Sequence, residues 1–177
     1  MNASPRSLAL AWGLGGGVLA ALVMVVPELL ARPDAGRLAE YAGLAAGLIA
    51  VHLGTRAAAR EDSGFGARLA NATLLAASVS LIAGFGLYAL FAVLRPGLLA
   101  ARLSAYQQSV STSGAPAERI ARELARLAAS RAEYLDAGYQ ALSSASTLFF
   151  FAMLLGGYGA WRAHLVGRLR RQGPGQR

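Results

Sequence analysis

Long apolar stretches alternate along this chain with short polar segments that hold nearly all of its charges. The apolar stretches lie at residues 8–26, 38–53, 69–94 and 139–161. A helix rises about 1.5 Å per residue, so about 20 apolar residues cross a hydrocarbon core about 30 Å thick. Three of the stretches meet that length, and the second is shorter. The pattern therefore predicts an integral membrane protein.

The spacing of the stretches predicts an all-α fold with four transmembrane helices. Too few residues remain outside them for a separate soluble domain, so we expect a single membrane domain over 1–177, built as a four-helix bundle. The predicted spans are about 8–28, 38–54, 69–94 and 139–161, with a helical extracytoplasmic connection at 95–138 and a basic cytoplasmic tail at 162–177.

The first two spans need separate arguments. The first follows Arg6 as the apolar region of a signal peptide would, but no small-residue cleavage site comes after it, which favours a retained span. In the second, Glu40 interrupts the apolar run near its start. Placing Glu40 at one interface and Arg56 at the other leaves a short span that local thinning of the bilayer can accommodate.

The long connection carries a helical pattern of its own. It is broken at 111–115, and after the break Ile120, Leu124 and Leu127 recur near helical spacing. Residues 98–110 form a second candidate helix before the break. We expect two amphipathic helices joined by a turn, lying against the outer face of the bundle. Such helices either cover their own protein or dock a partner helix, and both interpretations stay open.

The charges indicate the orientation of the chain. All 17 basic residues are Arg, and the formal net charge is +8. With four spans both termini lie on one side, and that side carries nine arginines and two acids, against eight arginines and seven acids on the other. The positive-inside rule counts basic residues near span ends and ignores acids, and by that count the long connection offers mainly Arg95, Arg102 and Arg131. The rule therefore predicts that both termini are cytoplasmic. The nine arginines are Arg6, Arg56, Arg60, Arg68, Arg162, Arg168, Arg170, Arg171 and Arg177.

No arrangement of residues indicates catalysis, a cofactor or a metal. The chain has no Cys, and its two His residues, His52 and His164, fall near one predicted interface. No HExxH motif or Cys/His cluster is present, and the glycine run at 13–17 lies inside a span instead of following a strand as a dinucleotide loop does. The arginines are spread over several segments, which disfavours nucleic acid. We predict no catalytic, cofactor-binding or metal-binding residue, and no enzyme.

Glycines recur at four-residue spacing in the first and second spans. Small residues let helix backbones approach closely, which is how packing drives helix association in lipid. These glycines pack inside this one bundle or form a helix surface offered to another subunit, and both interpretations stay open. The candidate helix-packing or partner-contact residues are Gly13, Gly17, Gly43, Gly47, Ile120, Leu124 and Leu127.

Two carboxylates flank the first outer connection. Glu28 lies at the end of the first span and Glu40 at the start of the second. Interfacial ion pairs of this kind contribute little to stability, whereas unpaired carboxylates would form a mouth that attracts cations. The expected cationic partners are Arg32, Arg37 and Arg95.

Several short motifs follow one another in a recognisable order. They are Glu-Tyr-Ala-Gly at 40–43, Gly-Thr-Arg at 54–56, Ser-Gly-Phe-Gly at 63–66, Pro96, Tyr106, and the run from Ser113 to Ile120. Between residues 36 and 161 this order resembles the bacterial inner-membrane family catalogued as domain of unknown function 4199. The resemblance implies four spans with a long connection between the third and fourth. It carries over no activity and no functional residue, and this chain departs from the family in an Ala- and Ser-rich third span and a longer tail.

The sequence thus predicts a non-enzymatic polytopic protein of the bacterial inner membrane, an accessory or regulatory subunit that acts by contact with another membrane component. The expected partners are the lipid bilayer and either another membrane protein or a second copy of this chain. The alternative is a homo-oligomeric channel or carrier for small solutes or ions, with the hydroxyls at 143–147 and Asn71 lining its pathway. Ser and Thr also commonly bond their own helix carbonyls, so neither function is selected by the hydroxyls alone.

Overall fold

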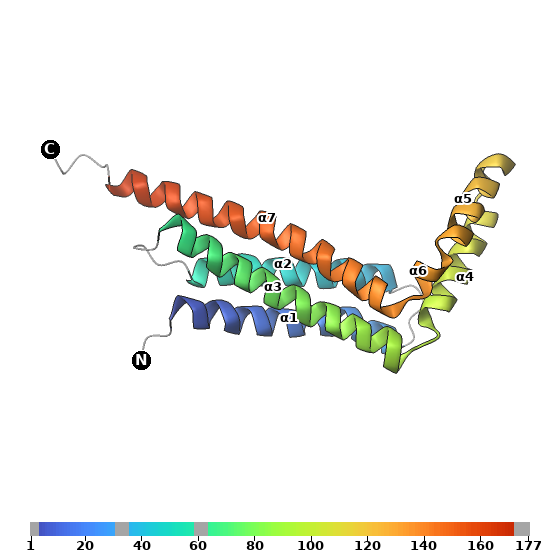
Figure 1. Ribbon diagram of the computed structural model, residues 1–177, viewed down its shortest axis with the longest axis horizontal. Coiled ribbons are helices and arrows are strands. Elements are labelled where there is room, and N and C mark those ends of the chain that lie inside the picture. The colour runs from blue at the N-terminus through green and yellow to red at the C-terminus, as the bar shows by residue number, and fades with distance from the viewer. Residues whose placement is uncertain (1–3, 31–35, 59–63, 172–177) are drawn as a thin grey trace.

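The computed structural model describes residues 4–30, 36–58 and 64–171, and this part of the chain contains helices and turns but no strand. Four long helices lie side by side, and three shorter ones project sideways from one end of the bundle (Figure 1). The predicted all-α class is confirmed. The long helices are α1 (Pro5–Leu29), α2 (Gly36–Ala58), α3 (Phe65–Ala89) with its π-helical continuation η1 (Leu90–Leu94), and α7 (Ala137–Arg171). The short ones are α4 (Leu98–Ser111), α5 (Ala117–Ala129) and α6 (Arg131–Leu135).

Among the described residues, four helical segments are long and apolar enough to cross a membrane, which confirms the predicted number of candidate spans and indicates a multi-pass membrane protein. The second apolar stretch, which the sequence left short, lies within a helix of 23 residues. At about 1.5 Å per residue α2 is about 35 Å long, because the helix continues through the polar residues at both of its ends. The segments are Pro5–Leu29, Leu38–Ala58, Phe65–Leu94 and Ala137–Leu169.

The bundle is arranged around α2 and α3. Helix α1 packs against both of them, and α7 packs against the same two helices. Successive long helices run in opposite directions, so α1 begins and α7 ends at the same end of the bundle, away from the short helices (Figure 1). Helix α7 continues unbroken beyond the predicted end of the fourth span as far as Arg171, since no Pro interrupts residues 162–171.

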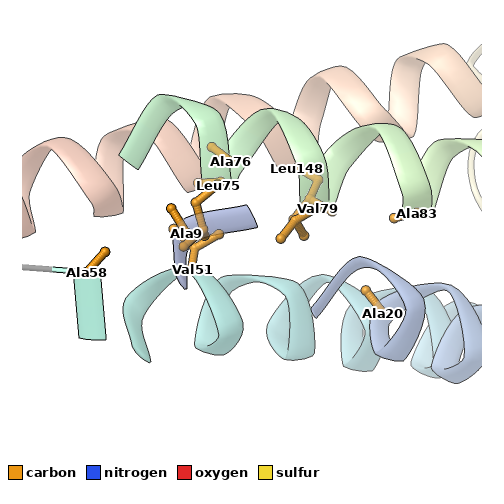
Figure 2. Close-up of a cluster of buried hydrophobic side chains, with 10 residues drawn as sticks. Ala9, Ala20, Val51, Ala58, Leu75, Ala76, Val79, Ala83 and Leu148 are labelled. Carbon is orange, nitrogen blue, oxygen red and sulfur yellow. The ribbon is translucent and has the colours of Figure 1, made fainter. Parts of the chain in front are cut away.

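Small side chains dominate the centre of the bundle. The main buried cluster contains six alanines. In Figure 2, Ala9, Val51 and Leu75 form one group and Val79 and Leu148 another, while the other labelled alanines are spread along the helices. The larger side chains that fill the cluster are Val51, Leu75, Val79 and Leu148. A second cluster lies near the end of the bundle that carries the short helices, and Met24, Leu87, Leu90, Phe91, Leu99 and Ala141 form it.

The glycines of the first span lie where α1 meets α3. A Cβ atom added at Gly13 would lie 2.7 Å from Ser78 Cβ, and one added at Gly17 would lie 2.8 Å from Ile82 Cβ. Carbon atoms do not approach so closely without moving. The two helix backbones are therefore in a contact that only glycine permits at these positions.

The glycines of the second span lie deeper in the bundle. A Cβ atom at Gly43 would lie 3.0 Å from the carbonyl oxygen of Ala20 in α1. One at Gly47 would lie 3.2 Å from side-chain atoms of both Val79 in α3 and Leu148 in α7. Both glycine stripes therefore face the protein's own helices, not the outside of the bundle.

The connection between the third and fourth spans contains the two predicted helices, α4 and α5, which pair as a hairpin. Their turn includes Gly114, whose φ of 68° lies in the left-handed region that favours glycine. The expected position against the outer face of the bundle is wrong, because the hairpin projects sideways, away from the long helices (Figure 1). The apolar edge of α5 is covered by α4 and not by the bundle, and the sequence did not predict the short helix α6.

Close packing at Gly17 yields a test of the bundle. We expect Gly17→Ala to lower the free energy of unfolding by about 1–3 kcal/mol, because the methyl group overpacks the contact between α1 and α3. Gly15→Ala is the matched control, since a Cβ there meets nothing within 4 Å. Reversible unfolding in micelles, followed by circular dichroism, measures both. Equal stability of the two variants would contradict the packing described here.

Candidate interaction surface

The guanidinium of Arg102 lies where α1, α2 and α4 meet. Arg102, in the second turn of α4, donates from Nη2 to Glu28 Oε1 and from Nη1 to Glu40 Oε1, both at 2.5 Å. Its Cζ atom also lies 5.5 Å from the centre of the Phe91 ring, within the range of a cation–π interaction. One cation therefore joins the end of the first span, the start of the second and the base of the hairpin.

Burial makes the partner of Glu28 important. The Glu28 side chain is only 9% exposed, compared with 41% for Glu40 and 31% for Arg102. A buried carboxylate that loses its counter-ion keeps its desolvation penalty, which is why breaking such a pair costs more than the pair itself contributes. The two ion pairs of Arg102 are called here its arm to Glu28 and its arm to Glu40. The arm to Glu28 is therefore the stronger structural constraint, and the arm to Glu40 is closer to an ordinary surface ion pair.

Arg95 completes this ion cluster of Glu28, Glu40, Arg95 and Arg102. Its Nη1 atom donates to the backbone carbonyl of Glu28 at 2.6 Å, so it binds a carbonyl in the last turn of α1. The π-helical turn brings Arg95 into place, since its N–H bonds to the Leu90 carbonyl at 2.7 Å before Pro96 ends the helix.

The predicted pairing of the two carboxylates is thus corrected. Both are bound by Arg102, which the sequence did not single out, and Arg95 contacts Glu28 through the backbone and not through its carboxylate. The other expected partners, Arg32 and the side chain of Arg37, lie outside the described residues. The pairing also leaves no open carboxylate mouth here, because Arg102 lies between the two acids.

The cluster keeps Arg102 charged. Burial alone lowers the pKa of the guanidinium, but the nearby charge of Glu40 and the hydrogen bonds to Glu28 and Glu40 outweigh it, so the pKa of Arg102 lies above its usual value. The guanidinium itself therefore does not titrate in the physiological range, and its bridge does not depend on its own protonation.

A signal for Arg102 does exist in the sequence. It is the only charged residue of α4, and it shares one helical face with Leu99, Leu103 and Tyr106, at offsets of three, one and four residues. A lone charge on the apolar face of an amphipathic helix indicates a partner from elsewhere in the fold. The identity of that partner could not be predicted, because it depends on how the chain turns at Pro96.

The predicted apolar residues of α5 form the interior of the hairpin. Leu127 is buried, and Ile120 and Leu124 are half-buried. The Tyr106 hydroxyl of α4 donates to Glu123 Oε1 at 3.4 Å, a long hydrogen bond across the same contact. These residues therefore close the hairpin on itself and are not its outer surface.

The outer surface of α5 has two unlike flanks. Taking 100° per residue, Ala121, Ala125 and Ala128 lie to one side of the buried edge. The arginines lie to the other side, and every one of these six residues is exposed. The arginines are Arg119, Arg122 and Arg126.

The polar groups proposed to line a pathway are not brought together. Ser143, Ser144, Ser146 and Thr147 are exposed on α7, and the Thr147 hydroxyl donates to the carbonyl of Ser143 at 2.9 Å. Asn71 lies toward the opposite end of the bundle. Its neighbour Ala72 contacts Gly156, whereas Gly84 contacts Ala145, so the two levels are twelve residues apart on α3, or about 18 Å.

The remaining candidate groups are scattered. His52 is exposed on α2, and His164 packs its ring against Phe65, with the ring centres 5.9 Å apart. Within residues 4–30, 36–58 and 64–171, no three His, Asp or Glu side chains come close enough to share a metal ion.

Described arginines lie at both ends of the bundle, whereas the described acids lie at one end only. The end where α1 begins and α7 ends carries Arg6, Arg56, Arg68, Arg162 and Arg168. The described acids all lie at the other end or in the short helices, and they are Glu28, Glu40, Glu118, Glu123, Glu133 and Asp136.

Comparison with models of protein families, with curated proteins and with solved structures finds no match to this chain. The resemblance to the bacterial inner-membrane family therefore stays a prediction, and the geometry itself carries the functional argument.

The hairpin interior gives a second test. We expect Leu127→Ala to destabilise the hairpin by about 2 kcal/mol or more, since Leu127 is 2% exposed and its loss leaves a cavity. Hydrogen exchange of the α4 and α5 amides should then accelerate while the long helices keep their protection. Leu135→Ala, at a residue 38% exposed, is the control and should leave exchange in α4 and α5 unchanged. Faster exchange throughout the bundle would contradict the hairpin's independence.

Proposed function

We propose that this chain is a non-enzymatic accessory or regulatory subunit of the bacterial inner membrane, acting by contact with another membrane component. The observation that carries the proposal is the hairpin of α4 and α5, which projects sideways from the bundle and exposes both of its flanks (Figure 1). A connection that served only to join two spans would not need a separately packed hairpin of this size.

The exposed flanks suit contact with another helix. The alanines at 121, 125 and 128 present a flat surface on which a partner helix can pack closely, and the arginines opposite can pair with acidic groups. Because the hairpin begins where α3 ends and returns where α7 begins, its base would lie at the membrane boundary, and the partner we propose is itself a membrane protein. The contact would regulate or stabilise that partner.

The orientation we propose places both termini in the cytoplasm and the hairpin outside. The arginines close to the span ends support this, since basic residues there favour the cytoplasmic side. Arg6, Arg56, Arg68, Arg162 and Arg168 lie near the span ends on the side of the termini, against Arg95, Arg102 and Arg131 on the other side. Arg162 and Arg168 extend α7 beyond Trp161, so they would reach the anionic headgroups of the inner leaflet. The resemblance in motif order supports the bacterial inner membrane as the location.

Single cysteines test this orientation, because the chain has none of its own. With Ser113→Cys in the exposed turn of the hairpin, a membrane-impermeant maleimide should label intact cells. With Gly64→Cys, at the opposite end and also exposed, labelling should require permeabilised cells. The reverse pattern would contradict the orientation and place the hairpin in the cytoplasm.

A homo-oligomeric channel or carrier is the second candidate function. The exposed hydroxyls of Ser143, Ser144, Ser146 and Thr147 favour it, since they would face a pathway formed between copies of α7. The distance of Asn71 from these residues weakens it. Solute flux into vesicles that contain this protein alone would support the second candidate over the first.

Photo-crosslinking from the hairpin tests the contact function. Probes attached at Ala121→Cys and Ala128→Cys, both on the alanine flank, should capture the same membrane protein from native membranes. A probe at Gly64→Cys is the control at the other end of the bundle and should not capture it. Capture of this chain only, or of different proteins at the two hairpin positions, would overturn the contact function.

A further inference from the structure

The hairpin is joined to the bundle by two short non-helical segments. One lies at Arg95, where φ is −142° and ψ is 67°, between the π-helical turn and α4. The other lies at Asp136, where φ is −81° and ψ is 112°, between α6 and α7. Both joints interrupt the helical hydrogen bonding, so the chain itself does not fix the angle between the hairpin and the long helices.

Side-chain contacts must then set that angle. At the second joint Gln140 Nε2 of α7 donates to the Glu133 carbonyl of α6 at 3.1 Å, and the other contacts lie at the base of α4. In its first turn Leu99 is buried in the cluster with Met24, Leu90 and Phe91 of the bundle. One turn further along, Arg102 reaches the carboxylates of α1 and α2. Beyond this turn, α4 faces α5 and α6.

The two contacts differ in kind. The apolar contact of Leu99 is non-directional, so it permits rotation about the base of the hairpin. The bridge of Arg102 is directional, because two different nitrogen atoms bind carboxylates on two different helices. The hairpin can thus rotate about the contact of Leu99, whereas the bridge of Arg102 opposes that rotation.

We propose that Arg102 is a latch that holds the hairpin in its sideways position at the end of the bundle, and that the hairpin swings about its two joints when the bridge to Glu28 and Glu40 opens. The inference rests on the proposed function only for its consequence, which is that the latch sets the direction in which the hairpin meets its partner. The swing itself is a property of this chain alone.

The strength of the bridge suits a latch. Arg102 and Glu40 are both partly exposed, so water and salt ions reach the bridge and weaken it. An acidic or basic group of a partner can compete for the same atoms. The ion pair with the buried Glu28 is shielded from salt and holds more firmly, so the exposed ion pair with Glu40 opens first.

Two spin labels measure the swing. Ser113→Cys in the hairpin turn and Leu154→Cys on α7 are both exposed, and pulsed electron paramagnetic resonance in lipid nanodiscs gives their distance distribution. We expect one narrow distribution in the parent protein and a distribution about twofold broader in Arg102→Gln, because the directional contact is lost. Arg122→Gln removes an exposed arginine of α5 that makes no ion pair among the described residues, and it should change nothing.

A milder variant covers the case in which Arg102→Gln does not assemble. Glu40→Gln weakens one arm and keeps both Leu99 and the arm to Glu28, so the fold should persist while the distribution broadens. Raising the salt concentration should broaden the distribution of the parent protein in the same way. Unchanged distributions in Glu40→Gln and at high salt would overturn the latch, as would an unchanged distribution in a folded Arg102→Gln.

The outcomes separate the latch from the proposed function. Broadening without any capture from Ala121 and Ala128 would keep the latch and reject the contact function. Capture with unchanged distributions would reject the latch and keep the contact function. Where both hold, Arg102→Gln should lower the capture yield from Ala121→Cys several-fold, since the flank no longer faces one direction.

Discussion

Close approach of helix backbones is the contact on which this fold depends. In lipid the surroundings of a helix are as apolar as its side chains, so burying leucine against leucine gains little, and packing must come from small residues that bring backbones together. At Gly17 and Gly47 the space beyond Cα is already occupied by atoms of neighbouring helices. Large side chains such as Leu81 and Phe85 remain on the outside, where lipid covers them.

This way of packing also explains where the bundle stops. The close contacts run along α1, α2 and α3 until α3 passes into its π-helical turn and Pro96 ends it. Charged side chains are tolerated there, because at the membrane boundary they can contact water as well as ionic partners. Glu28 lies just inside this boundary and is buried, so it requires Arg102, and this requirement draws the base of the hairpin onto the bundle.

Features that depend on local pattern could be predicted from the sequence. The four spans follow from runs of apolar residues. The second helix of the hairpin follows from the spacing of Ile120, Leu124 and Leu127, and the first from the stretch at 98–110 before the break. The glycines of the first two spans could be identified as packing residues. The faces they contact could not, because a four-residue spacing defines a stripe on one helix without defining its neighbour.

Features that depend on how distant segments of the chain meet could not be predicted from the sequence. Arg102 lies 62 residues from Glu40 and 74 from Glu28 along the chain. Their meeting depends on the turn at Pro96, which also directs the hairpin sideways. The sequence therefore assigned the acids to nearer arginines, of which Arg95 reaches Glu28 only through its backbone carbonyl. It also placed the hairpin against the bundle, which is wrong for the same geometric reason.

The positions of the polar side chains favour a contact function over a transport function. A transport pathway within one bundle requires polar side chains that face each other near the middle of the membrane. Here the centre of the bundle is filled by alanines with Val79 and Leu148, and the hydroxyls of α7 lie on the outside. Conduction would therefore require several copies with α7 facing inward. Contact through the hairpin requires only one copy of this chain, because both flanks of the hairpin are exposed and Leu99 and Arg102 bind its base to the bundle. We therefore favour a contact function over conduction.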